Sequence, residues 1–110
     1  MSVSAPFTPS GNTVVFTANT SAPSPVQALS TTLGGNQYRV INAGSTLVFM
    51  GVGVTSSDAS NNAVVVSSSQ KAIPLLAGTD EIISFLPNAY FTGITSSGTA
   101  TVYVTPGDGD

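Results

Sequence analysis

The chain has 110 residues, of which two are basic and five acidic, and it contains no histidine and no cysteine. Two basic side chains cannot neutralise a run of phosphates or form a basic membrane patch, so we expect neither nucleic-acid nor membrane binding. Without an imidazole base, a thiolate or a zinc ligand set, we expect no enzyme activity, no metal site and no cofactor. Polarity comes from 30 serines and threonines, and the scarcity of charge with a mean hydropathy of +0.31 favours association.

The first twelve residues contain Pro6, Pro9 and Gly11 and lack hydrophobic periodicity. This pattern predicts an extended N-terminal arm over residues 1–12, neither strand nor helix. Twelve extended residues reach about 40 Å, and Phe7 has no core of its own to enter. We therefore expect Pro6, Phe7 and Pro9 to contact a partner, with a disordered tail as the alternative.

Eight runs rich in β-branched and aromatic residues follow the arm, each bounded by Gly, Asn, Ser or Pro, which is typical of β-strands. They lie at residues 13–17, 25–29, 37–42, 46–54, 72–76, 81–85, 90–94 and 99–105. Such short strands without a long helix predict a single all-β domain over residues 13–106, a β-sandwich of jelly-roll or Greek-key type. An immunoglobulin-like sandwich is the alternative, and residues 107–110 are expected to form an acidic tail.

Three local patterns refine this fold. In the last strand, threonines and Tyr103 alternate with Val102 and Val104, so the two valines should face the core. The turn at 96–98 predicts a hairpin back to the strand at 90–94. In the fourth strand, Gly51 and Gly53 indicate a bulge or a close approach of backbone.

The segment 58–65 is the only helical candidate. Asp58 could cap a turn that runs through residues 59–63. Asn and Ser are poor helix formers, so we expect one or two turns at most.

The charged residues give little sign of catalysis. Asp80 and Glu81 are adjacent and should point to opposite faces of a strand, which prevents a direct acid–base pair. Lys71, the only lysine, follows a serine-rich loop that does not resemble a nucleophile elbow. The ending Asp108-Gly109-Asp110 has too few oxygen ligands for a calcium loop.

Arg39 and Tyr90 are the remaining candidates for partner binding. Arg39 lies in a strand on the face opposite to Tyr38 and Val40. It is either an exposed arginine with its stem on apolar neighbours, or one half of a bidentate ion pair with an acid of another subunit. Tyr90 is either core or partner contact.

Five stretches resemble small virion proteins of tailed bacteriophages. They read VSAPFTP (3–9), QYRVINAG (37–44), IPLLAGT (73–79), LPNAYFTGI (86–94) and SGTATVYVTPG (97–107), and together cover less than half of the chain. The resemblance implies a capsid cement, or decoration, protein with a β-sandwich fold and no catalytic residues.

From this resemblance we expect a virion structural protein that binds between subunits of the phage major capsid protein and stabilises the shell. It would be synthesised in the host cytoplasm and would lie on the capsid surface as a homo-oligomer, a trimer at local three-fold positions. One alternative is a fibre or receptor-binding module that binds glycan, for which Tyr90 with Asn88 and the segment 56–62 are the candidates. The other is a head–tail or tail component.

Overall fold

The computed structural model describes residues 7–30 and 36–108, which contain nine strands and one helix. The strands are β1 (Thr8–Pro9), β2 (Val14–Ala18), β3 (Val26–Gln27), β4 (Gln37–Asn42), β5 (Val48–Gly53), β6 (Ile73–Leu75), β7 (Asp80–Ser84), β8 (Tyr90–Ile94) and β9 (Ala100–Asp108). The helix, α1 (Ser56–Asn62), follows β5. Within the described parts, no helix has the length and apolar character needed to cross a bilayer.

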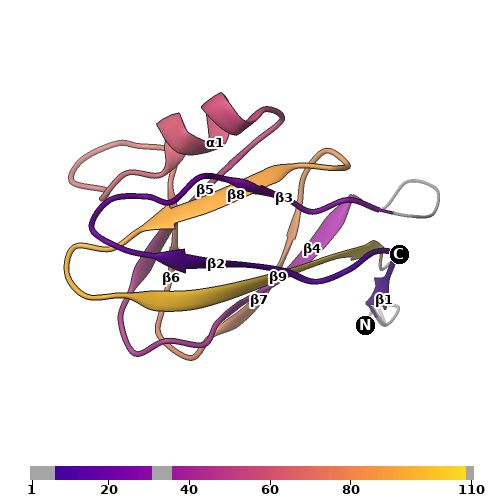
Figure 1. Cartoon of the computed structure of the whole chain (residues 1–110), viewed down its shortest axis with the longest axis horizontal. Helices are drawn as coiled ribbons and strands as arrows, with labels where there is room; N and C mark the ends of the chain where they lie inside the picture. The colour runs from indigo at the N-terminus through magenta and orange to yellow at the C-terminus, as the bar shows by residue number, and fades with distance from the viewer. Residues whose placement is uncertain (1–6, 31–35, 109–110) are drawn as a thin grey trace, which may run out of the picture.

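The strands form two antiparallel sheets packed face to face, which confirms the predicted β-sandwich (Figure 1). In sheet A the order is β2-β9-β4-β7, with β1 paired to the far end of β9 beside β2. In sheet B the order is β3-β8-β5-β6. The chain changes sheet at almost every connection, and these two strand orders are those of a jelly roll.

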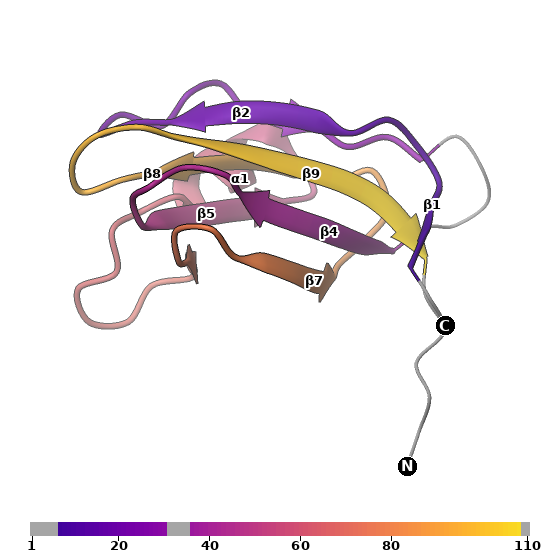
Figure 2. The same ribbon diagram turned by 90° about the horizontal axis from the view of Figure 1, so that it is seen from below.

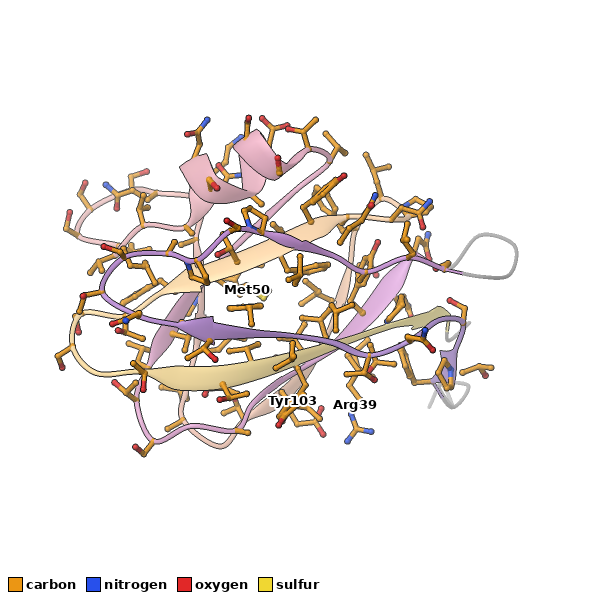
Figure 3. The ribbon with its side chains drawn as sticks, in the orientation of Figure 1. Arg39, Met50 and Tyr103 are labelled. Atoms are coloured by element: carbon orange, nitrogen blue, oxygen red, sulfur yellow. The ribbon has the colours of Figure 1, made fainter. Side chains whose placement is uncertain are left out.

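Strand alternation places the core between the sheets. Val102 and Val104 are fully buried, as predicted, and so are Tyr38 and Val40 on the neighbouring β4. Met50 of β5 lies in the space between the sheets, whereas Tyr103 and Arg39 point out of sheet A on its other side (Figure 3). A slip of one residue in either strand would exchange these two sets of side chains.

One aromatic contact joins the sheets directly. Tyr38 of sheet A meets Phe91 of sheet B edge to face, with ring centroids 4.9 Å apart. The Tyr38 hydroxyl donates to the Leu86 carbonyl and accepts from the Ala89 amide, which fixes the turn before β8. Burial raises the pKa of this phenol, so it stays a neutral donor.

The helix lies against β5 where that strand has glycines. A Cβ atom on Gly51 would stand 2.3 Å from the Ala59 carbonyl oxygen, and one on Gly53 would stand 2.5 Å from the Asp58 Cβ. The predicted close approach is therefore confirmed, while the regular pairing of β5 with β8 leaves no bulge. The predicted cap is wrong, because the Thr55 hydroxyl accepts from the Asp58 amide and the helix begins at Ser56.

The predicted hairpin between residues 90–94 and 99–105 is wrong. β8 pairs with β3 and β5 in sheet B, and β9 pairs with strands of sheet A. The turn at 96–98 exists, with Gly98 at a φ of +76°, but it carries the chain from one sheet to the other. Turn residues specify a reversal of direction, and the pairing partner is set by the rest of the core.

The prediction of an extended N-terminal arm is also wrong for the part of it that the structure describes. Thr8 and Pro9 form β1 and pair with Asp108 and Gly107, and the Ser10 amide donates to the Pro106 carbonyl at 2.9 Å. Residues 7–12 thus lie on their own domain, and β9 continues into the segment predicted as an acidic tail. Residues 1–6 and 109–110 lie outside the described residues.

Asn42 is the main polar group of the core. It is fully buried, and its Nδ2 donates to the carbonyls of Thr46 and Leu75, each at 2.9 Å. Its Oδ1 accepts from the Gly44 amide at 3.0 Å. The side chain thereby ties the turn after β4 to the end of β6 in the other sheet.

Replacing Asn42 by alanine should lower the free energy of unfolding by about 3 kcal/mol. Three backbone groups lose their hydrogen-bond partner, and those that are buried cannot bond to water instead. Chemical denaturation measures the change. Asn61→Ala, on the exposed side of α1, is the matched control and should cost less than about 0.5 kcal/mol. Equal costs for the two variants would contradict this role for Asn42.

Candidate functional site: the outer face of sheet A

Apart from Phe7, which packs over Gly107 at one end, no other described segment of the chain covers the outer face of sheet A. Figure 2 looks onto it, with β2, β9, β4 and β7 in front and α1 behind them. The side chains that point outward at its centre define what we call the outer A face. They are Val15, Arg39, Ile41, Asp80, Ile82 and Tyr103.

Apolar side chains form a row over β2, β9 and β4 on this face, and Ile82 of β7 lies in the neighbouring row, opposite Arg39. Val15 lies opposite Tyr103, and Tyr103 lies opposite Ile41 on the next strand. Val15 is 49% exposed and Tyr103 41%, and Ile82 on the edge strand is 53% exposed. Three large apolar groups that remain this accessible on one sheet face are a feature of interaction surfaces.

Hydroxyl groups border the apolar row. Thr13 and Thr105 share a hydrogen bond of 2.7 Å between their Oγ1 atoms. Thr17 and Thr101 form the next pair along β2 and β9. Hydroxyls can exchange their hydrogen bonds for those of a partner at a much smaller desolvation cost than charges.

The only charges on the outer A face neutralise each other. The Nε atom of Arg39 donates to both carboxylate oxygens of Asp80, at 3.0 and 3.2 Å, and Nη2 donates to Oδ2. Hydrogen bonding to Arg39 holds the pKa of Asp80 below its usual value, with the positive charge of the guanidinium adding to the effect. Arg39 therefore already has a carboxylate within its own chain, and its role toward a partner stays a prediction.

The outer face of sheet B is covered to a greater extent. α1 lies over Gly51 and Gly53, and the Thr92 hydroxyl donates to the Pro23 carbonyl at 2.7 Å beneath the loop before β3. Tyr90 is half-buried on this side, opposite Gly53 and Gln27. This asymmetry leaves sheet A with the more open outer face.

The structure separates the residues that the sequence suggested for partner binding. Arg39 belongs to the outer A face and Tyr90 to the other sheet. Phe7 packs over Gly107, where a Cβ would stand 2.4 Å from its ring, so it has a site on its own domain at the end of the outer A face. Pro9 is exposed in β1, and Pro6 lies outside the described residues.

Sequence reasoning did not single out Val15, Ile82 or Tyr103 as a surface. The period-two pattern of β9 already placed Tyr103 outward, and the same rule applied to β2 and β7 would have placed Val15 and Ile82 there. What the sequence lacked was the order of the strands, which brings these three residues onto one sheet.

The remaining chemistry of the described residues offers little for catalysis. Residues 7–30 and 36–108 contain no group of three histidine, cysteine or acidic side chains that could hold a metal ion. Asp80 points to the outer A face while Glu81 lies opposite the core residue Val40, so the two adjacent acids do not share a face.

No protein-family model matches the chain, and no curated protein or solved structure matches it significantly.

Replacing Arg39 by glutamine should raise the pKa of Asp80 toward its ordinary value of about 3.9. A carboxyl NMR titration measures this shift, and Arg39→Lys, which keeps the charge but loses the forked donor, should give a smaller one. The ion pair contributes stability above the unfolded pKa of Asp80 and loses it as pH falls through the lowered folded pKa. Since both groups are exposed, the contribution is small. An unchanged Asp80 pKa in Arg39→Gln would contradict the assigned pairing.

Proposed function

We propose that this chain is a non-enzymatic structural protein of a tailed-bacteriophage particle, which decorates the capsid by placing its outer A face on the major capsid protein. The observation that carries the proposal is the uncovered sheet face, where Val15, Ile82 and Tyr103 lie among hydroxyls with no net charge. Its test is binding to phage heads.

A surface of this composition fits a contact with a large protein partner. The exposed apolar groups supply the favourable burial that a protein interface needs at its centre. Arg39 and Asp80 neutralise each other's charge, so no isolated charge is desolvated when the face is covered. Many weak contacts of this kind are sufficient on a shell, because copies linked to one another rebind at high effective concentration.

Two further observations agree with a role in a particle. The jelly roll is found in viral capsid proteins, although it also occurs in lectins and other domains, so this support is an analogy of fold. The five stretches that resemble phage virion proteins extend over β1, β4, β6, β8 and β9. The expected homotrimer and the position at local three-fold axes stay predictions.

Binding to heads of the phage that encodes the chain tests the proposal. Purified chain should cosediment with expanded heads and should stabilise them against heat. Ile82→Lys should abolish cosedimentation, because it replaces an exposed apolar side chain of the outer A face by a charge that contact with the partner would desolvate. Leu76→Lys is the matched control, since Leu76 is 66% exposed but follows β6 outside the outer A face.

Both variants must retain the thermal unfolding temperature of the unmodified chain for the comparison to count. Cosedimentation of Ile82→Lys at the level of the unmodified chain would overturn the proposed surface. Copy number then separates decoration from the alternatives. A decoration protein is present in numbers comparable to the major capsid protein, whereas a fibre or head–tail component is present in few copies at one vertex.

A further inference from the structure

A cleft of about 410 Å³ opens where β5 and β7 end, beside α1. Its apolar lining comes from Val52, Val54 and Phe85, together with the backbone of Gly53. Its polar lining comes from Asp58 and Asn62 of α1 and from Lys71, which precedes β6. The volume lies within the range of small-molecule sites, about 300–1,000 Å³.

The two charges in this cleft are free to act on a ligand. Within the described parts of the chain, neither the Asp58 carboxylate nor the Lys71 ammonium forms a hydrogen bond or an ion pair. The chain has only seven charged residues, and Lys71 is its single lysine. A carboxylate that only accepts hydrogen bonds and an ammonium that only donates them therefore border the same space.

The helix that carries two of the three polar lining residues is fixed in place. Asp58 and Asn62 are four residues apart, so they lie one above the other on the same side of α1. Asn62 Nδ2 donates to the Val52 carbonyl at 2.9 Å, and Gly51 and Gly53 let the helix backbone pack onto β5. The part of the lining that α1 contributes is thus set before a ligand arrives, which lowers the entropic cost of binding.

We propose that this cleft binds a single pyranose ring, as a free sugar or as the terminal residue of a glycan. A pyranose has an apolar C–H face and a rim of hydroxyls that both donate and accept. The C–H face would pack on Phe85 and the valines. Neighbouring hydroxyls would donate to the Asp58 carboxylate and accept from Lys71, and the Asn62 carbonyl oxygen would accept from a third.

The site is separate from the outer A face. None of its lining residues belongs to that face, and α1 lies on the opposite side of sheet A (Figure 2). Sugar binding by the isolated chain does not depend on the proposed function. If the chain does decorate a shell, which rests on that proposal, a weak single-site affinity is multiplied by the number of copies displayed.

A titration of the ¹⁵N-labelled full chain, followed by amide NMR, tests the site. The probes are the methyl glycosides of glucose, galactose and mannose, N-acetylglucosamine and N-acetylneuraminic acid. At least one should cause saturable shifts confined to residues 52–54, 58–62, 71 and 85. Sorbitol, which has hydroxyls but no ring, should cause none, and glycine serves as a zwitterion without a sugar.

Substitutions in the cleft test whether the sugar that causes the shifts binds there. Asp58→Asn and Lys71→Gln should each raise the Kd for the binding sugar by about tenfold or more, since each removes a charge-assisted hydrogen bond. Glu81→Gln, an exposed acid outside the cleft, should leave the Kd unchanged. Dispersed amide spectra establish that each variant is folded.

Three results would overturn the site: no saturable shift with any of the five sugars, shifts centred outside the cleft, or the same Kd in Asp58→Asn and Lys71→Gln as in the unmodified chain. Cleft shifts caused by glycine and not by sugars would show that its ligand is a small zwitterion and would equally overturn the proposal. Since these measurements use no phage heads, their failure leaves the decoration proposal standing, and a failure of head binding leaves the sugar site standing.

Discussion

The register of β9 is the constraint on which the rest of the molecule depends. This strand runs through the middle of sheet A, with β1 and β2 on one side and β4 on the other. Its register directs Val102 and Val104 into the core and Tyr103 outward. β4 follows the same alternation and carries Arg39 outward to meet Asp80 of β7. A one-residue shift would bury the charged side of the sheet, so the core and the outer A face are specified together.

The core contains few ionisable groups but still contains polar atoms. Side-chain amides and hydroxyls provide the hydrogen bonds that these atoms need. Asn42 links a turn of sheet A to β6, the Tyr38 hydroxyl holds the turn before β8, and Thr92 secures the loop before β3. Among the described residues, no buried side-chain nitrogen or oxygen lacks a partner. Neutral groups can perform this task in a dry interior without the cost of burying charge.

The sequence was sufficient for the sandwich and for most of its strands, because period-two patterns such as that of Val102 and Val104 are local. It could not supply pairings that depend on distant segments. Arg39 meets Asp80 across 41 positions, and Lys71 and Phe85 reach the cleft from separate loops. The turn at 96–98 led to a false hairpin for the same reason, since its residues report a bend and not the sheet beyond it. Thr8–Pro9 is too short a strand to leave any pattern.

The jelly roll leaves most of one sheet face bare and covers more of the other, and a smaller polar cleft lies at its edge. The proposed function assigns the bare face to a broad protein contact. The cancellation of Arg39 by Asp80 has a kinetic consequence for that broad contact. A face without net charge adds little to long-range electrostatic attraction, and ordinary protein pairs associate at about 10⁵–10⁷ M⁻¹ s⁻¹. For the same reason dissolved ions have little to screen, and attachment through this face would hold with similar strength in dilute and in concentrated electrolyte.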